Sequence, residues 1–278
     1  MNSKILPAPD RPRTETQLGS LIRQWRDKRG RSQLQLSLDM GVSQRHISFV
    51  ESGRSSPSRA LLLGLAEALS IPFRDRNALL LAAGFAPVYS EKAWNTAEMR
   101  AVNRALERVL KQNEPFPSLV LDRHWNVLAT NPYADRFFGS FYDLEARPGE
   151  LNLLRMILDP NAMRPFIENW DEVTRGVLER INRDCVCGTA DGFGRSLVAE
   201  LVGFPSATMD WAAKDRPSST PVVPFSFVKD GQLLKYFSMT SSVAMPQTIA
   251  SQELRVESFY PADDATEAWH AEAFTVTA

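Results

Sequence analysis

The sequence has few of the features that mark secreted, membrane-spanning or metal-binding proteins. Only two cysteines occur in 278 residues, Cys185 and Cys187. They are too few for a structural zinc site and too close for an easy mutual disulfide, so incidental thiols are favoured, with redox sensing as the alternative. No apolar run approaches the roughly 20 residues needed to span a bilayer, and the amino terminus lacks a signal-peptide core. These absences predict a cytoplasmic location and no membrane partner.

Catalytic motifs are also missing from the sequence. The three histidines, His46, His124 and His270, are scattered and have no metal-binding spacing to cysteine or carboxylate. There is no glycine-rich phosphate loop, no nucleophile elbow and no nucleophile–base signature. We therefore expect no metal, no catalytic residue and no enzymatic activity.

What is present is a soluble globular composition with an uneven distribution of charge. Hydrophobic residues make up 44% and charged residues 23%, and the length suits about two domains. Residues 1–90 hold 13 Lys and Arg against 7 Asp and Glu, a formal charge of +6, and the rest of the chain carries −7. A basic amino-terminal region followed by an acidic remainder suits a protein that binds the phosphates of DNA through the amino-terminal region alone.

The stretch from Gln33 to Arg54, QLQLSLDMGVSQRHISFVESGR, reads as two short helices joined at Gly41. Leu36 with Met40, and Ile47 with Val50, place apolar side chains on one face of each helix. Ser43 is a suitable N-cap for the second helix, and Gly53 is placed to end it. With the inner face filled, Gln44, Arg45, Ser48 and Phe49 are left to point outward. Gln and Arg at the start of an exposed helix can read adenine and guanine in the major groove.

This segment resembles the helix-turn-helix of the XRE and phage-repressor type, and the resemblance extends across Leu18 to Phe85. It implies an ion pair between Arg26 and Glu51, and a phosphate contact for Gln33. The ordinary alternative is a helical hairpin within a larger core. The residues expected to contact DNA are Gln33, Ser43, Gln44, Arg45, His46, Ser48, Phe49 and Arg54, with Arg26 and Glu51 as structural residues.

Two departures from the pattern of that family stand out. Ser37 occupies the position that usually holds alanine, where a small side chain allows close approach of the helices. Leu34 and Leu38 are apolar where polar residues are usual, and their i, i+4 spacing makes them a candidate dock for another part of the protein.

The chain divides into five expected regions: a flexible tail (1–14), a five-helix DNA-binding domain (15–85), a connector with a linking helix (86–113), a second domain (114–266) and a terminal tail (267–278) that ends in a short helix. Within the connector, 93–112 has a strongly amphipathic helical pattern. That helix could join the domains, pair in a dimer or cap the second domain.

The second domain begins and ends with strand patterns. Strands are expected at 119–121, 125–130, 222–228, 233–243 and 254–260, with Asp230-Gly231 as a hairpin turn. Helices are expected between the first and last strands, at 131–138, 152–157, 163–183, 193–202 and 207–213. This order predicts an α+β fold, PAS-like in its arrangement, with helices on an antiparallel sheet.

The stretches PSLVLDRHWNVLATNPYADRFF, NLLRMIL, ENWDEV and KYFSMTSSVAMPQTIASQELRVESFYPADDAT are similar to the MmyB-type ligand-binding domain of bacterial regulators. The resemblance covers roughly Pro115 to Thr266 and implies a small-molecule pocket, which in one family member is thought to hold a fatty acid. Leu151-Asn152 and Arg180-Ile181 depart from the family's pattern at positions where it has arginine-containing pairs.

The residues permit such a pocket, with bulky apolar walls and a few polar groups for a head group. The alternative for each is a plain structural role, because aromatic residues are core formers and Asn131 is a suitable helix cap. The candidate ligand-binding residues are Trp125, Asn131, Phe137, Phe138, Asn152, Leu154, Arg155, Trp170, Phe225, Phe227 and Phe237.

Together these patterns predict a homodimeric transcription regulator that binds double-stranded operator DNA and responds to a small effector, a fatty acid or acyl compound. The alternative is a ligand-independent DNA-binding regulator whose second domain serves dimerisation or partner recruitment. The sequence does not choose between activation and repression.

Overall fold

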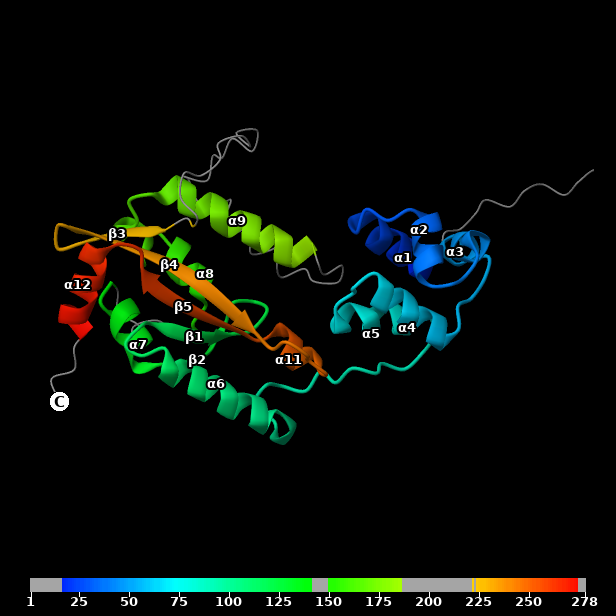
Figure 1. Cartoon of the computed structure of the whole chain (residues 1–278), viewed down its shortest axis with the longest axis horizontal. Helices are drawn as coiled ribbons and strands as arrows, with labels where there is room; N and C mark the ends of the chain where they lie inside the picture. The colour runs from blue at the N-terminus through cyan, green and yellow to red at the C-terminus, as the bar shows by residue number, and fades with distance from the viewer. Residues whose placement is uncertain (1–16, 142–149, 187–221, 223, 275–278) are drawn as a thin grey trace, which may run out of the picture. The chain divides into compact units, whose positions relative to one another are not determined.

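The computed structural model describes residues 17–141, 150–186, 222 and 224–274. The chain forms two compact units, residues 1–89 and 90–278, which are described separately below (Figure 1). Among the described residues, no helix combines the length and the apolar character needed to cross a membrane.

The first unit is all helical, as the sequence predicted. Its helices are α1 (Gln17–Lys28), α2 (Gln33–Asp39), α3 (Gln44–Glu51), α4 (Arg59–Ala68) and α5 (Phe73–Ala82). Three of them begin at a serine N-cap, Ser32, Ser43 and Ser58, whose side chain accepts from a backbone N–H of the first turn. Gly41 has φ +64°, so the turn between α2 and α3 needs a residue without a side chain. Local signals therefore fix the position of α3.

The first unit ends at Tyr89, four residues later than expected. The side-chain oxygen of Asn77 accepts from the N–H groups of Val88 and Tyr89, and its amide donates to the carbonyl of Tyr89. The Tyr89 ring stacks on Phe73 with centroids 4.1 Å apart. Residues 86–89 thus pack on α5 and are not a free connector.

The second unit contains a five-stranded antiparallel sheet with the order β2-β1-β5-β4-β3. Its strands are β1 (Ser118–Leu121), β2 (Val127–Thr130), β3 (Phe225–Lys229), β4 (Gln232–Ser242) and β5 (Arg255–Pro261). Asp230 and Gly231 both have positive φ, at 50° and 78°, which fits the two-residue hairpin predicted between β3 and β4. The α+β fold class is confirmed.

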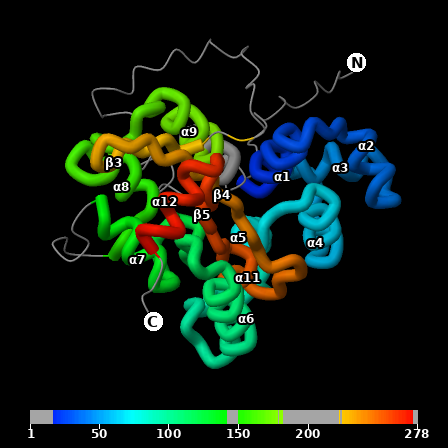
Figure 2. Tube along the Cα trace, turned by 60° about the vertical axis from the view of Figure 1, so that its left-hand side comes forward, coloured from blue at the N-terminus to red at the C-terminus, as the bar shows by residue number. Residues whose placement is uncertain are grey.

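Helices cover both faces of this sheet (Figures 1 and 2). The amphipathic helix α6 (Arg100–Gln112) packs on one face through Val102, Leu106 and Leu110 against Val120 and Val256. Of the three roles open to this helix, the structure places it as a cap on the second unit, so it is not a separate linking element.

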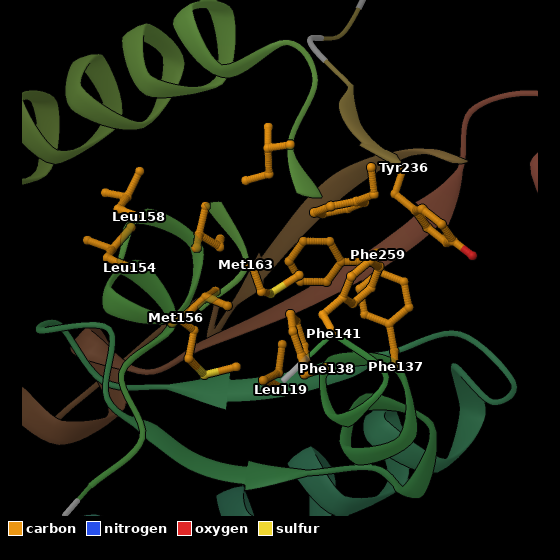
Figure 3. Close-up of a cluster of buried hydrophobic side chains, with 14 of the residues drawn as sticks. Leu119, Phe137, Phe138, Phe141, Leu154, Met156, Leu158, Met163, Tyr236 and Phe259 are labelled. Atoms are coloured by element: carbon orange, nitrogen blue, oxygen red, sulfur yellow. The ribbon is translucent and has the colours of Figure 1, made fainter. Parts of the chain in front are cut away.

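The larger core lies on the opposite face, under α7 (Pro132–Gly139), α8 (Leu153–Leu158), α9 (Trp170–Val186) and α12 (Asp264–Phe274). Aromatic rings dominate this core, as Figure 3 shows for Phe137, Phe138, Phe141, Tyr236 and Phe259. The Phe137 ring lies edge-on to Phe138 and Tyr236, at centroid distances of 5.2 and 4.9 Å. These rings fill the space between the sheet and its helices.

Two helices begin later than the sequence pattern predicted. Residues 97–99 form a 3-10 turn before α6, and the carbonyl of Trp94 accepts from the Asn103 side chain instead of a helical N–H. Before α9, Asn169 donates to the carbonyl of Pro224 and accepts from the N–H of Ser226, so this stretch joins the edge of β3. In both places a tertiary contact outweighs helical periodicity.

The carboxyl-terminal region also differs from the sequence prediction in its helices. A short helix, α11 (Ile249–Glu253), precedes β5 where none was expected. The residues assigned to a tail from 267 belong to α12, whose His270 and Phe274 are buried against the sheet. The boundary expected at residue 266 is therefore wrong. The helices expected at 193–202 and 207–213 lie outside the described residues.

His270 and Tyr236 form a buried polar pair that links α12 to β4. The Tyr236 hydroxyl lies 2.9 Å from Nδ1 of His270, and Nε2 lies 3.1 Å from the carbonyl oxygen of Pro115. A neutral imidazole satisfies both contacts when Nε2 carries the hydrogen and Nδ1 accepts. Burial lowers the pKa of His270, against smaller opposing effects of the Pro115 carbonyl and Glu267. Burial likewise raises the pKa of Tyr236.

This pair predicts loss of stability at acidic pH. The pKa of His270 is lower in the folded state, so the unfolded state binds more protons as the pH falls. The stabilisation is fully present above the unfolded pKa of about 6.5 and is lost as pH falls from there through the folded pKa, at up to about 1.4 kcal/mol per pH unit. We expect His270→Gln to reduce this slope in denaturation measured across the acidic range. His124→Gln is the control, and an equal reduction by both variants would contradict the prediction.

Candidate functional site

The exposed start of α3 carries the side chains expected to read DNA. Ser43 caps the helix by accepting from the N–H of His46 at 3.2 Å. Ile47 and Val50 are buried at 1% and 2% exposure, which fixes the rotation of the helix about its axis. As a result Gln44, Arg45 and His46 are all exposed on the other side. This is the placement that entry of a helix into the major groove requires.

Phe49 connects two arginines of this surface. Its half-buried ring lies beneath the guanidinium carbons of Arg45 and Arg54, at 5.0 and 5.7 Å from the ring centroid. Both distances are within the range of a cation–π contact. Ser48 is also half-buried. Phe49 therefore orders two cations on the outer side of α3, and its contact with a base stays a prediction.

A buried carboxylate, Glu51, ties the first three helices together. Its oxygens accept from Nε and Nη2 of Arg26 at 2.6 and 3.1 Å, which confirms the ion pair implied by the family pattern. Its Oε2 also accepts from Nε2 of Gln33 at 2.8 Å. The hydrogen bonds to Glu51 raise the pKa of Arg26. Because Gln33 is held in this way, its side chain has a structural role, and the phosphate contact expected of it stays a prediction.

The two departures from the family pattern have different structural outcomes. Ser37 is buried, and its hydroxyl donates to the carbonyl of Leu34 at 2.7 Å, so the polar atom is satisfied within α2. Leu34 and Leu38 are exposed at 51% and 72%. The docking role expected of these two leucines stays a prediction.

The second unit contains a cavity of about 320 Å³ between α8, α9 and the sheet. This volume is at the lower end of the range of small-molecule sites. The described residues that line it are Trp125, Leu153, Leu154, Ile157, Val173, Gly176, Val177, Arg180, Val222, Phe225, Phe237, Ser238, Glu257 and Phe259. The wall is mainly apolar, with a small polar group at Arg180 and Glu257.

Four of the candidate ligand-binding residues line this cavity: Trp125, Leu154, Phe225 and Phe237. Phe137, Phe138 and Phe227 are instead fully buried in the core. They are as apolar as the lining residues, so sequence could not separate the two groups.

The other four candidates lie elsewhere, and the two asparagines among them have structural roles. Asn131 caps α7 and donates to the carbonyls of Leu110 and Phe116. Asn152 caps α8 and donates to the carbonyl of His124 at 2.7 Å. Arg155 is exposed on α8, and the half-buried ring of Trp170 lies 4.5 Å from the guanidinium carbon of Arg164. None of these four is among the described residues of the cavity wall.

Sequence reasoning missed the polar group that does line the cavity. Arg180 of α9 and Glu257 of β5 form two parallel hydrogen bonds of 2.7 Å. Glu257 is 2% exposed. The sequence did contain a signal for this pair. Glu257 is the one carboxylate in the expected strand RVESFY, and a carboxylate is rarely buried without a partner.

The structure was also searched for a metal site and for the places of the two cysteines. The described part of the chain contains no group of three or more His, Cys, Asp and Glu placed to hold a metal ion. Cys185 lies near the end of α9, and Cys187 falls outside the described residues.

Comparison with known proteins gives a family match for each of the two units. Residues 22–75 match a helix-turn-helix family model, and residues 102–272 match the model of the MmyB-like transcription regulator ligand binding domain. Among solved structures, the clp gene regulator ClgR from Corynebacterium glutamicum is 26% identical over 35% of this chain and 90% of its own, with a TM-score of 0.22. No curated protein matches the chain. The second model covers more than half of the sequence, so the chain belongs to the MmyB-like transcription regulators, as a DNA-binding helix-turn-helix protein with that family's ligand-binding domain.

Proposed function

We propose that this regulator senses a small, mainly apolar or acyl-type molecule in the cavity between α8, α9 and the sheet, and that binding changes its affinity for operator DNA. The observation that carries this proposal is the cavity itself, about 320 Å³ in volume, whose described residues form a mainly apolar wall with one ion pair. Apolar burial would supply most of the binding free energy, and the polar group would orient the ligand.

On DNA the protein would act as a homodimer in the cytoplasm. Two copies of α3 would enter successive major grooves about one helical turn apart on a pseudo-palindromic operator. Gln44 and Arg45 would contact base edges, and Arg54 would contact phosphate.

The first test is native mass spectrometry of the purified full-length protein, followed by identification of any small molecule released on denaturation. A dimer with a stoichiometric apolar compound supports sensing and provides a ligand for titration against operator binding. If a bound compound has no effect on operator affinity, sensing is wrong and the ligand-independent alternative is favoured.

A substitution at Gly176 tests whether this cavity is the ligand site. Gly176 lies on α9 and lines the cavity, and a Cβ added there meets no atom within 4 Å. We expect Gly176→Leu to fill the cavity and abolish ligand binding while α9 stays folded, because leucine favours a helix over glycine by roughly 0.5–1 kcal/mol. The readouts are native mass spectrometry and circular dichroism.

The matched control is Arg175→Leu, which places the same side chain at an exposed neighbouring position of α9. It should keep the ligand and the ligand response. If Gly176→Leu is folded and still binds as well as Arg175→Leu, the ligand occupies another site.

A further inference from the structure

Arg180 and Glu257 form the polar end of the cavity, and the exposed Thr240 beside them joins their hydrogen-bond network. Arg180 donates from Nη1 and Nη2 to the two carboxylate oxygens of Glu257, each at 2.7 Å. Thr240 of β4, directly opposite Glu257 in the sheet, donates to Oε2 at 2.8 Å and accepts from Nη2 of Arg180 at 2.8 Å. The Arg180 guanidinium carbon also lies 4.3 Å from the centroid of the Trp125 ring. The three polar groups satisfy one another, and Trp125 holds the guanidinium in place.

The charge of this end of the cavity is balanced before any ligand arrives. The side chain of Arg180 is 24% exposed, and that of Glu257 is 2% exposed. Arg180 faces its counter-ion across a bidentate contact, the strongest geometry for such a pair. Ser238 adds a hydroxyl to the wall but no charge. Arg180 and Glu257 are the charged side chains among the described residues of the wall, so along this part of it a ligand would meet a paired, hydrogen-bonding surface. The Arg255 guanidinium carbon lies 5.7 Å from the Trp125 ring centroid, but Arg255 is not among the described lining residues.

This balance disfavours a ligand with a carboxylate head. To bind Arg180 alone, such a head would have to displace Glu257 and leave this buried carboxylate without its partner, which is strongly unfavourable. To bind beside the intact pair, it would place a second negative charge close to Glu257, which repels it. An uncharged hydroxyl, amide or ester avoids both costs and can accept from N–H groups of Arg180 that Glu257 and Thr240 leave available.

We propose that this cavity selects short- or medium-chain molecules with an uncharged hydrogen-bonding head group, and discriminates against carboxylates of the same chain length. This inference rests on the proposed function and narrows the ligand class from small apolar or acyl-type molecules in general to those with a neutral alcohol, amide or ester head group. Arg180 and Glu257 act together as the specificity-determining pair.

The test compares three probes with the same alkyl chain: octan-1-ol, octanamide and octanoate. Each is titrated into the full-length wild-type protein at neutral pH by isothermal calorimetry, and operator binding is measured in parallel. We expect the alcohol and the amide to bind at least about tenfold more tightly than octanoate, which corresponds to 1.4 kcal/mol. Equal or tighter binding of octanoate overturns the inference but leaves the proposed function intact. Binding of none of the three overturns both.

A charge variant provides an independent test. Glu257→Gln keeps the shape of the side chain and removes its negative charge, so Arg180 becomes a cation without a counter-ion. We expect the ratio of octanoate to octanol affinity to rise at least about tenfold in this variant. Glu272→Gln, at an exposed position of α12, is the control and should leave the ratio unchanged. An unchanged ratio in folded Glu257→Gln contradicts the assigned role, and the wild-type comparison still decides if the variant does not fold.

Discussion

Glu51→Ala is expected to destabilise the first unit by about 3 kcal/mol or more, because it removes one partner of a buried ion pair. Glu51 has no exposed surface, and its two oxygens hold Arg26 of α1 and Gln33 of α2. Alanine would leave both donors without their acceptor, and Arg23, whose Nε lies 3.6 Å from Oε2 of Glu51, would lose the same carboxylate. Arg26 keeps contacts with Asp27 and the carbonyl of Arg31, so we expect the loss at the lower end of the range for broken buried pairs.

Hydrogen exchange of the amides in α3 measures this loss within residues 17–89, without a contribution from the second unit. The control is Glu67→Ala, because Glu67 is exposed on α4. Similar protection of α3 in both variants would show that Glu51 does not hold the helices together. Glu51→Gln should have an intermediate effect, since it keeps the shape of the side chain but weakens the charge-assisted hydrogen bonds.

Arg45→Ala is expected to weaken specific operator binding by about 1–3 kcal/mol in each half-site, the usual value of a bidentate arginine–guanine contact. Arg45 is exposed in the first turn of α3, and Phe49 lies beneath its guanidinium. An arginine held in this way loses less freedom on binding than a mobile one. The effect should be a loss of at least about tenfold in affinity.

The operator needed for this measurement can be selected from random duplex DNA with the wild-type protein. Arg45→Ala should relax base preference at one position of each half-site, and Arg54→Ala should weaken binding to all sequences and lower its dependence on salt. Arg104→Ala, exposed on α6 of the second unit, is the control for loss of one positive charge. Unchanged base preference in Arg45→Ala would show that another residue reads the operator.

The sequence alone was sufficient to predict the helices of the DNA-binding unit, because the residues that begin, end and orient these helices are close together in the chain. The serine caps lie three residues before the N–H groups that donate to them, and Gly41 supplies the turn by its own conformation. The apolar spacing of Ile47 and Val50 then decides which side of α3 faces outward. The Arg26–Glu51 pair spans a longer separation, and the family pattern supplied it.

The cavity of the second unit depends on contacts that sequence spacing does not report. Arg180 and Glu257 are 77 residues apart, and Tyr236 and His270 are 34 apart. Aromatic residues have the same apolar character whether they fill the core or line a cavity, so Phe137 and Phe225 could not be distinguished from the sequence. Asn131 and Asn152 had the chemistry of ligand anchors but were used as helix caps.

Local caps, turns and helical periodicity thus determined the helix-turn-helix and the outward position of the residues expected to read DNA. Only the tertiary structure decided where α9 begins, that α12 packs on the sheet, and which charged pair lines the cavity. The physical reason is that a cap or turn is stabilised by near neighbours in the chain, whereas a cavity and its buried ion pair exist only where distant elements pack together.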